Sequence, residues 1–426
     1  MSSKPEPTPK YIAPSQLCIG LHVHLDLSWM EHPFTFSSFK IKSLEQIETI
    51  QSLGLTRIRY SPEKSDCAAL PAPQATAPAP PPAADREHDP MYRAKRARIE
   101  QLVAQRAKLA ACEREFLSSA RAVKSINENL FARPEESRLE AARLVQAMAD
   151  SMLTETEIAI NLMKDKIGSE EVYHHSLNVT LLSLMLAKEL KAPAEAIHLL
   201  GLGAMFHDIG KVEIPDRIVR KTEALTKPEA ALLRQHGAYG LEIGRKLGLT
   251  PESLAVITQH HEYVDGSGYP KGLQGPQISL LAKIVAITNA YDNLCNPANP
   301  AKALTPHEAL STMYAQQRAM FETVPLNTFV RCMGVYPPGT IVVLSNDSIG
   351  MVTSVNSARP LKPTVLIYDP AVPKEEAILA ELEHEPDVTI SRTLKPQQLP
   401  APVFEYLSPR KRLTYYFNSE PGSPGK

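Results

Sequence analysis

Histidine is concentrated in one stretch of the chain. Seven of the 13 histidines lie between His174 and His261, and several of them stand beside acidic residues. The segment from about Glu170 to Gly334 reads as a succession of helices. A helical bundle can turn such side chains inward, and converging imidazole and carboxylate groups suit first-row divalent metals. The pattern therefore predicts a helical domain with a buried histidine and carboxylate cluster.

The residue types in this stretch favour catalysis over a purely structural role. A single buried histidine is usually a hydrogen-bonded core residue, but five separated positions with acidic neighbours are hard to explain in that way. No cysteine lies close to them, which argues against a structural zinc site. An aspartate that follows a histidine directly, as in His207-Asp208, can bridge two metals. A pair of bridged metals is suited to hydrolysis.

Charge and hydropathy exclude other classes of protein. The chain has 426 residues, and 46 lysines and arginines nearly cancel 47 aspartates and glutamates, so DNA binding driven by a basic surface is not expected. Its longest apolar stretches, such as Leu199 to Phe206, are too short for a membrane span, and the first ten residues lack the apolar core of a signal peptide. We expect a cytoplasmic protein. The five cysteines lie far apart in the sequence and are interpreted as reduced.

Changes in the sequence pattern along the chain predict a mainly α protein, with a small α/β domain near the N-terminus and a small β subdomain near the C-terminus. The predicted segments are a small α/β domain (11–66), an Ala/Pro-rich linker (67–90), a helical stalk (91–168), a helical domain (169–335), a small β subdomain (336–400) and a tail (401–426). In the first of these, alternation from Leu21 to Leu27 predicts a strand with His22 and His24 on its polar face. We interpret these two histidines and His32 as solvated, with a metal site there as the weaker alternative.

The stalk carries a seven-residue apolar row, formed by Leu102, Leu109, Phe116, Val123 and Leu130. A zipper also requires a second apolar row, but here that row contains polar and charged residues. The sequence is therefore compatible both with a homodimer contact through the stalk and with packing of the stalk against a neighbouring helix. The tail combines Arg410-Lys411-Arg412 with three aromatic residues. A solvated tail is favoured over one that binds RNA or a membrane.

The motifs of the helical domain resemble those of the HD-GYP family. The resemblance covers about 165 residues and rests on His207-Asp208-Ile209-Gly210-Lys211, His236 with Gly240, His260-His261-Glu262, and Asp265-Gly266-Ser267-Gly268-Tyr269-Pro270. It implies an all-helical HD-superfamily bundle, two or three iron or manganese ions, and hydrolysis of the bacterial messenger cyclic di-GMP. Residues 11–66 also resemble an uncharacterised domain that often precedes HD-GYP units.

The resemblance also implies roles for individual residues. Asp208 corresponds to the bridging ligand and Glu171 to an acidic position associated with a third metal, while Lys211 corresponds to a lysine that contacts the substrate phosphate. The loop Gly268-Tyr269-Pro270 is implied to contact substrate. The remaining implied metal ligands are His175, His207, His236, His260, His261 and, by position, Asn289.

Two positions depart from the family pattern. An aspartate ligand is usual where this chain has Asn289, and a neutral amide holds a hard cation less tightly; Asp292 is a substitute candidate three residues later. The usual Arg-Pro-Tyr stretch reads Ala298-Asn299-Pro300 here, so a cationic clamp on the second phosphate is missing and only Lys302 is nearby.

The sequence thus predicts a phosphodiesterase that opens cyclic di-GMP to pGpG, with GMP as a further product. The alternatives are a weakened module that senses cyclic di-GMP or docks a protein, and a phosphohydrolase for another nucleotide. Expected partners are GGDEF-domain or other signalling proteins and a second copy of the chain.

Overall fold

The structure is a computed structural model. It describes residues 10–27, 31–34, 36–71, 93, 96, 100, 103, 107, 114, 117–154, 159–162, 171–356, 359–370, 372–374, 377–385, 387–407 and 415–417. Within the described parts, no helix has both the length and the apolar composition that a membrane span requires.

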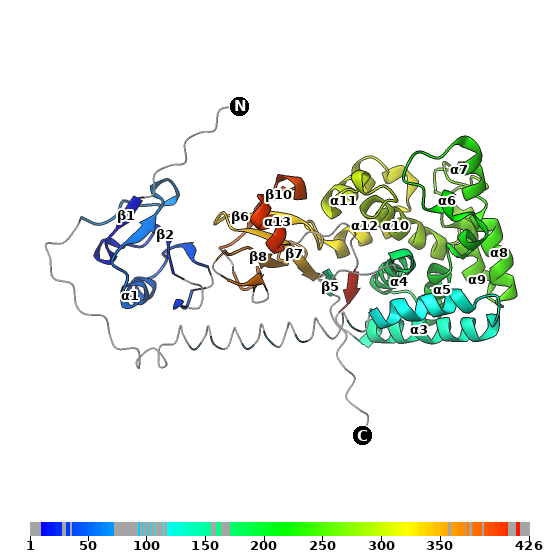
Figure 1. The fold of residues 1–426 in the computed structure, drawn as a ribbon, viewed down its shortest axis with the longest axis horizontal. Coiled ribbons are helices and arrows are strands. Elements are labelled where there is room, and N and C mark those ends of the chain that lie inside the picture. Colours follow the sequence, from blue (N-terminus) through cyan, green and yellow to red (C-terminus); the bar gives the residue numbers. More distant parts are fainter. Residues whose placement is uncertain are drawn as a thin grey trace, which may run out of the picture. The chain divides into compact units, whose positions relative to one another are not determined.

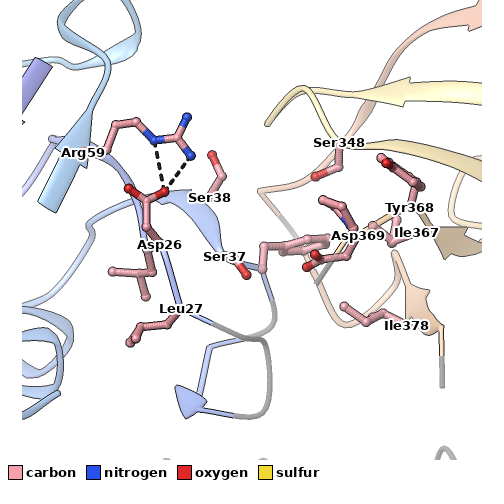
Figure 2. A pocket seen from close by; sticks show the side chains of 13 residues that line it. Asp26, Leu27, Ser37, Ser38, Arg59, Ser348, Ile367, Tyr368, Asp369 and Ile378 are labelled. Atoms are coloured by element: carbon pink, nitrogen blue, oxygen red, sulfur yellow. Dashed lines mark hydrogen bonds and ion pairs between the residues drawn. The ribbon is translucent and has the colours of Figure 1, made fainter. Parts of the chain in front are cut away.

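The N-terminal domain is a four-stranded antiparallel sheet with one helix. Its elements are β1 (Lys10–Ile12), β2 (His22–His24), β3 (Ser38–Lys40), α1 (Leu44–Ser52) and β4 (Ile58–Tyr60), with 3-10 turns at η1 (Pro14–Gln16) and η3 (Pro62–Lys64). The strand order is β1-β4-β2-β3. Arg59 on β4 donates to Asp26 Oδ1 through Nε at 3.1 Å and Nη2 at 2.7 Å, which ties β4 to the end of β2 (Figure 2).

Local sequence signals define the helix and the core of this domain. The side chain of Ser43 accepts from Gln46 N at the start of α1, and Gly54 adopts a left-handed φ of +74° just after its end. The alternating residues Leu21, Val23 and Leu25 are buried. They form a single core with residues from the other strands and from α1, namely Ile12, Leu17, Phe34, Ile41, Ile47, Ile50 and Ile58.

The expectation that the N-terminal histidines are solvated is wrong. His22 is 5% exposed and His32 is fully buried. Strand β2 lies inside the sheet, and the segment after β4 covers its polar face: His22 N donates to Ser65 Oγ at 2.9 Å, and Ser61 N donates to the His22 carbonyl at 2.9 Å. Burial is the main reason that the pKa of both His22 and His24 falls to about 4.

The helical domain begins with α3 (Pro134–Thr154), which packs against α5 and α4 (Figure 1). The helices and turns that follow are α4 (Glu171–Glu189), α5 (Ala194–Met205), η5 (Ile209–Glu213), α6 (Asp216–Val219), α7 (Lys227–Leu233), α8 (His236–Lys246), α9 (Pro251–Gln259), η6 (Gly275–Gln277), α10 (Leu280–Cys295), η7 (Pro300–Lys302), α11 (Pro306–Ala315), η8 (Arg318–Met320) and α12 (Thr323–Met333). Helix α5 packs on α4 and α9, and α10 packs on both α4 and α9. The core of the domain lies among these four helices.

Part of the predicted stalk is described. Residues 117–129 are helical, and Val123 and Leu130 are buried. Leu102, Leu109 and Phe116 lie outside the described residues. Residues 159–162, which fall in the segment expected to be helical, form strand β5 (Ala159–Leu162) instead, because they pair with a later strand.

The C-terminal strands form a larger sheet than the sequence suggests. Apolar alternation predicts strands at 340–344, 351–355 and 364–368. Strands β6 (Ile341–Leu344), β7 (Ile349–Asn356) and β8 (Thr364–Ile367) match these three, and β9 (Ile378–Glu381) and β10 (Ile390–Leu394) add to them. The main order is β10-β6-β7-β5-β11, and β8 pairs with β7 and β9. The predicted tail contributes α13 (Ala401–Leu407) and β11 (Tyr415–Phe417), which pairs with β5. The tail aromatics are therefore in a strand, while Arg410, Lys411 and Arg412 lie outside the described residues.

Candidate metal centre

The centre of the site is the carboxylate of Asp208, which has a group of histidines at each oxygen. Its Oδ2 lies 3.3 Å from His207 Nε2 and 3.5 Å from His175 Nε2. Its Oδ1 lies 3.5 Å from His236 Nε2 and 3.8 Å from His260 Nε2. Asp208 thus belongs to two groups compact enough for a metal ion, one with His175 and His207 and the other with His236, His260 and His261.

Backbone carbonyls orient three of these rings. His207 Nδ1 lies 2.7 Å from the Ala204 carbonyl oxygen, and His236 Nδ1 lies 2.7 Å from that of Leu233. His260 Nδ1 lies 2.9 Å from the Ile257 carbonyl oxygen. Because Nδ1–H donates in each case, the Nε2 lone pair is left to point at Asp208, which is the usual orientation of a metal-binding histidine.

A carboxylate orients the fourth ring. His175 Nδ1 lies 2.6 Å from Asp292 Oδ2. The other oxygen of Asp292 accepts from Asn178 Nδ2 at 2.8 Å and Asn296 Nδ2 at 2.9 Å. Asp292, named above as a substitute ligand, therefore supports His175 from behind, and the sequence alone did not reveal that role.

The protonation states suit metal binding. Burial lowers the pKa of His260 and of His261 well below the usual value, with neighbouring histidines adding to the effect, and burial also lowers the pKa of His236. Burial would raise the pKa of Asp208, but the Lys211 ammonium and His207 hold it well below the usual value. Neutral imidazoles and an ionised carboxylate are the forms that bind metals.

His175 is the exception among these groups. Burial opposes its protonation, but the hydrogen bonds to Asp208 and Asp292 outweigh burial and raise its pKa to about 9. A cation between His175 and Asp208 would take the place of that proton.

Two glycines allow the site elements to come together. A Cβ on Gly210 would lie 2.0 Å from the His236 carbonyl oxygen and 2.4 Å from Gly240 N. A Cβ on Gly240 would lie 2.7 Å from Ile257 Cγ2. Backbone contact between η5 and α8 therefore brings His236 to Asp208. The capping box at Thr226 predicts the start of a helix, and the expectation that this helix carries His236 is wrong: the capped helix α7 ends at Leu233, and His236 begins a separate helix, α8.

The loop after α9 is held by a buried carboxylate. Glu262 is buried, and its two oxygens accept from Lys271 N at 2.7 Å and Leu273 N at 2.9 Å. A Cβ on Gly268 would lie 2.4 Å from the His261 carbonyl oxygen, so only glycine fits there. Pro270 follows Tyr269 in this loop through a cis peptide bond.

Tyr269 places an aromatic face beside the cluster. Its ring stacks on His261 with centroids 4.5 Å apart and an interplanar angle of 20°. The guanidinium carbon of Arg234 lies 5.0 Å from the centroid of the Tyr269 ring. Arg234 is exposed and stands two residues before His236. Sequence reasoning missed it, because the contact with Tyr269 joins residues far apart in the chain.

The three remaining predicted site residues are Lys211, Asn289 and Glu171. Lys211 Nζ donates to Asp208 Oδ2 at 2.5 Å. Asn289 is buried on α10, one turn before Asp292, and its Oδ1 accepts from Asn293 Nδ2 at 2.7 Å. Glu171 is the first residue of α4, but its side chain lies outside the described part of the structure.

The donor set fits a pair of divalent cations. It offers five imidazoles and one shared carboxylate, all buried or nearly so, and no thiolate is among the compact groups in the described residues. Imidazole and carboxylate donors without thiolate suit iron, manganese, cobalt or zinc at a catalytic site.

Comparisons with known proteins agree with this arrangement. Residues 10–141 match a domain of unknown function, DUF3391, and residues 132–322 match the HD domain. The chain is 29% identical over 374 residues to the cyclic di-GMP phosphodiesterase PA4108 of Pseudomonas aeruginosa, covering 84% of this chain and 85% of that protein.

Two further similarities are more limited. The cyclic di-GMP phosphodiesterase response regulator RpfG of Xanthomonas campestris is 32% identical over 149 residues, which is 34% of this chain and 39% of that protein. A solved structure, Bd1817, an HDG"Y"P protein from Bdellovibrio bacteriovorus, has a TM-score of 0.42 and 15% identity over 75% of this chain and 98% of its own. The chain thus combines a DUF3391 domain with an HD domain, and the two histidine groups around Asp208 lie within the HD domain.

Proposed function

We propose that the protein is a metal-dependent phosphodiesterase that hydrolyses cyclic di-GMP to pGpG and further to GMP. The observation that carries the proposal is the position of Asp208, whose two carboxylate oxygens face two separate histidine groups. The similarity to PA4108 over most of both chains supports the choice of cyclic di-GMP as substrate.

Each group of side chains would hold one cation. His175 and His207 supply one set of donors, His236, His260 and His261 supply the other, and Asp208 serves both. Iron and manganese are the proposed metals, and Glu171 and Asn289 are the proposed additional ligands. When bound, such a metal pair supplies Lewis acidity to a phosphoryl oxygen and lowers the pKa of water.

Charged and aromatic residues around the cluster would position the substrate. Lys211 is proposed to bind the phosphate that reacts, because its ammonium already lies beside Asp208 and its side chain is 33% exposed. Tyr269, which stacks on His261 and lies beside Arg234, is proposed to contact the substrate together with Gly268 and Pro270. Arg234 is the proposed contact for the second phosphate, since it lies against Tyr269 and the described structure gives it no carboxylate partner.

Asn289 supports a second candidate, a module that binds cyclic di-GMP with little turnover. Its carbonyl oxygen is already an acceptor for Asn293, and an amide lacks the charge that holds a hard cation. In that case the protein would act as a sensor or as a docking partner.

One experiment separates these functions. The full chain is loaded anaerobically with Fe(II) or Mn(II), the metal content per chain is measured, and cyclic di-GMP, 3′3′-cGAMP and pGpG are each followed by chromatography. Turnover of cyclic di-GMP that depends on the metal supports the enzyme. Binding of cyclic di-GMP by a fully loaded protein without turnover supports the sensor, and turnover of 3′3′-cGAMP alone would contradict the proposed substrate.

The proposed substrate also implies a biological setting. GGDEF-domain proteins and a second copy of the chain are the proposed partners, and the cytoplasm is the proposed location, where cyclic di-GMP would be encountered. Sedimentation of the full chain tests the dimer.

A further inference from the structure

Two segments at the edges of the N-terminal domain are joined by a row of hydrogen bonds. Asp66 N donates to the Gly20 carbonyl at 2.9 Å, and Leu70 N donates to the Gln16 carbonyl at 2.9 Å. Gln16 Nε2 in turn donates to the Leu70 carbonyl at 2.9 Å. Residues 16–20 therefore run beside residues 66–70 and hold the side chains between them in fixed register.

This register brings two cysteines together. Cys18 Sγ lies 3.0 Å from Cys67 Sγ. Cys67 Sγ also donates to the Ile19 carbonyl at 3.1 Å, and Cys18 Sγ to the Ala68 carbonyl at 3.4 Å. Both thiols are only half-buried, whereas Cys295 and Cys332 are buried in the helical domain. The two cysteines lie far apart in the sequence, as noted above, and the fold brings them together across 49 residues.

A glycine makes room for the two sulfurs. Gly20 has a φ of +96°, and a Cβ there would lie 3.4 Å from Cys67 Sγ and 3.3 Å from Asp66 Cβ. The gap between the thiols exceeds a disulfide bond of about 2.05 Å by roughly 1 Å. Rotation of the two side chains moves the sulfurs in the direction that closes such a gap.

We propose that Cys18 and Cys67 are a thiol-redox modification site that forms a reversible disulfide. The oxidant is a small disulfide such as oxidised glutathione. The thiolate of Cys67 attacks one sulfur, which breaks the glutathione disulfide, forms a mixed disulfide and releases one glutathione thiolate. The thiolate of Cys18 then attacks the Cys67 sulfur and releases the second. Two protein thiols are oxidised, one glutathione disulfide is reduced to two thiols, and the two protons pass to the leaving sulfurs.

The surroundings of Cys18 are consistent with this order of attack. Burial, followed by the sulfur contact with Cys67 and the charge of Cys67, raises the pKa of Cys18 to about 11. A thiol whose pKa is raised in this way forms little thiolate, which assigns Cys18 to the second step. Once Cys67 is in a mixed disulfide, it no longer repels Cys18 as a thiolate, and Cys18 can act as the resolving thiol.

The bond would join the two ends of the domain. The chain between Cys18 and Cys67 contains β2, β3, α1 and β4, and the Ala/Pro-rich segment follows shortly after Cys67. Oxidation would thus close a loop around most of the domain core and hold the start of that segment against residues 16–20. This inference does not depend on the proposed phosphodiesterase function.

The test uses the full chain in buffers with different ratios of oxidised to reduced glutathione. Free thiols are counted by alkylation and mass spectrometry, and tryptic peptides are mapped without reduction. We expect five thiols in the reduced protein and two fewer in the oxidised one, with one peptide pair joining Cys18 to Cys67. Thermal unfolding of the N-terminal domain should shift upward by at least about 8 °C on oxidation.

Single variants provide the controls. Cys18→Ser should abolish both the linked peptide pair and the thermal shift, and Cys112→Ser should keep both. A thiol count that stays at five in oxidised glutathione would overturn the proposal. So would a glutathione adduct that persists on Cys67, or a disulfide that uses any other pair.

Discussion

The contact between η5 and α8 predicts a large effect for Gly210→Ala. The new methyl group would lie 2.0 Å from the His236 carbonyl oxygen, so this oxygen must move by about 1.4 Å to reach the 3.4 Å of an ordinary contact. Both obstructing atoms belong to the backbone of α8, and no side-chain rotation relieves the clash. Overpacking in a core costs about 1–3 kcal/mol, and we expect the upper end of that range here.

The same movement should weaken the metal site. His236 Nε2 lies 3.5 Å from Asp208 Oδ1, and a displacement of about 1 Å at the start of α8 would disturb this pairing. We expect metal affinity to fall at least tenfold, or ~1.4 kcal/mol, and the unfolding temperature of the helical domain to fall by about 6–12 °C. Metal content by mass spectrometry and calorimetric unfolding measure the two effects on one preparation.

Gly237→Ala on the same helix is a matched control. Its Cβ would lie 3.6 Å from the Ile257 carbonyl oxygen and 4.0 Å from Thr258 Cα, which are ordinary contacts. Since alanine favours a helix over glycine by about 0.5–1 kcal/mol, this variant should be slightly more stable and should keep its metal. If Gly210→Ala retains wild-type metal content and stability, the close backbone approach is not what positions His236.

Further substitutions address individual side chains of the site. Asp292→Asn should lower metal affinity about 10–100-fold through the His175 ring, measured by competition with a chelator, and an unchanged affinity would show that Asp292 does not orient the ligand. Arg234→Ala should raise KM for cyclic di-GMP about tenfold with little change in kcat, and an effect confined to kcat would contradict a phosphate contact. Asn289→Asp should raise both metal affinity and turnover, and a fully loaded, fast wild type would make the natural asparagine an adequate ligand. Asp208→Ala should abolish metal loading and activity together, whereas a Tyr269→Ala variant keeps its metal; loading that survives in Asp208→Ala would refute the shared role of that carboxylate.

The clustering of the candidate metal ligands was predictable because its signal is local. His207 and Asp208 are adjacent, His260 and His261 are adjacent, and each pair ends a helix, so residue type and spacing alone indicate a metal site. Helix boundaries with a capping residue were equally accessible. Ser43 and Thr226 cap α1 and α7 through hydrogen bonds to residues three positions later.

Contacts between distant residues were not predictable in this way. Asp292 is 117 residues from His175 in the sequence. The two side chains meet only because α10 packs against α4. The break before His236 also depends on a tertiary contact, because α8 must approach Gly210 along its own axis. Strands β5 and β11 exist because they find partners in the sheet, and their short sequences carry too weak a pattern to be recognised alone.

In the N-terminal domain, too, some features follow from the sequence pattern and others only from the tertiary structure. The alternation of Leu21, Val23 and Leu25 determined which residues enter the core, since side chains on a strand alternate between faces by geometry. The surroundings of His22, on the opposite face of β2, depend on the tertiary structure. The segment after β4 contacts His22 through Ser65, and the same segment brings Cys67 to Cys18. A sequence pattern fixes the faces of a single element, but the neighbours of each face are fixed only when the chain folds back on itself.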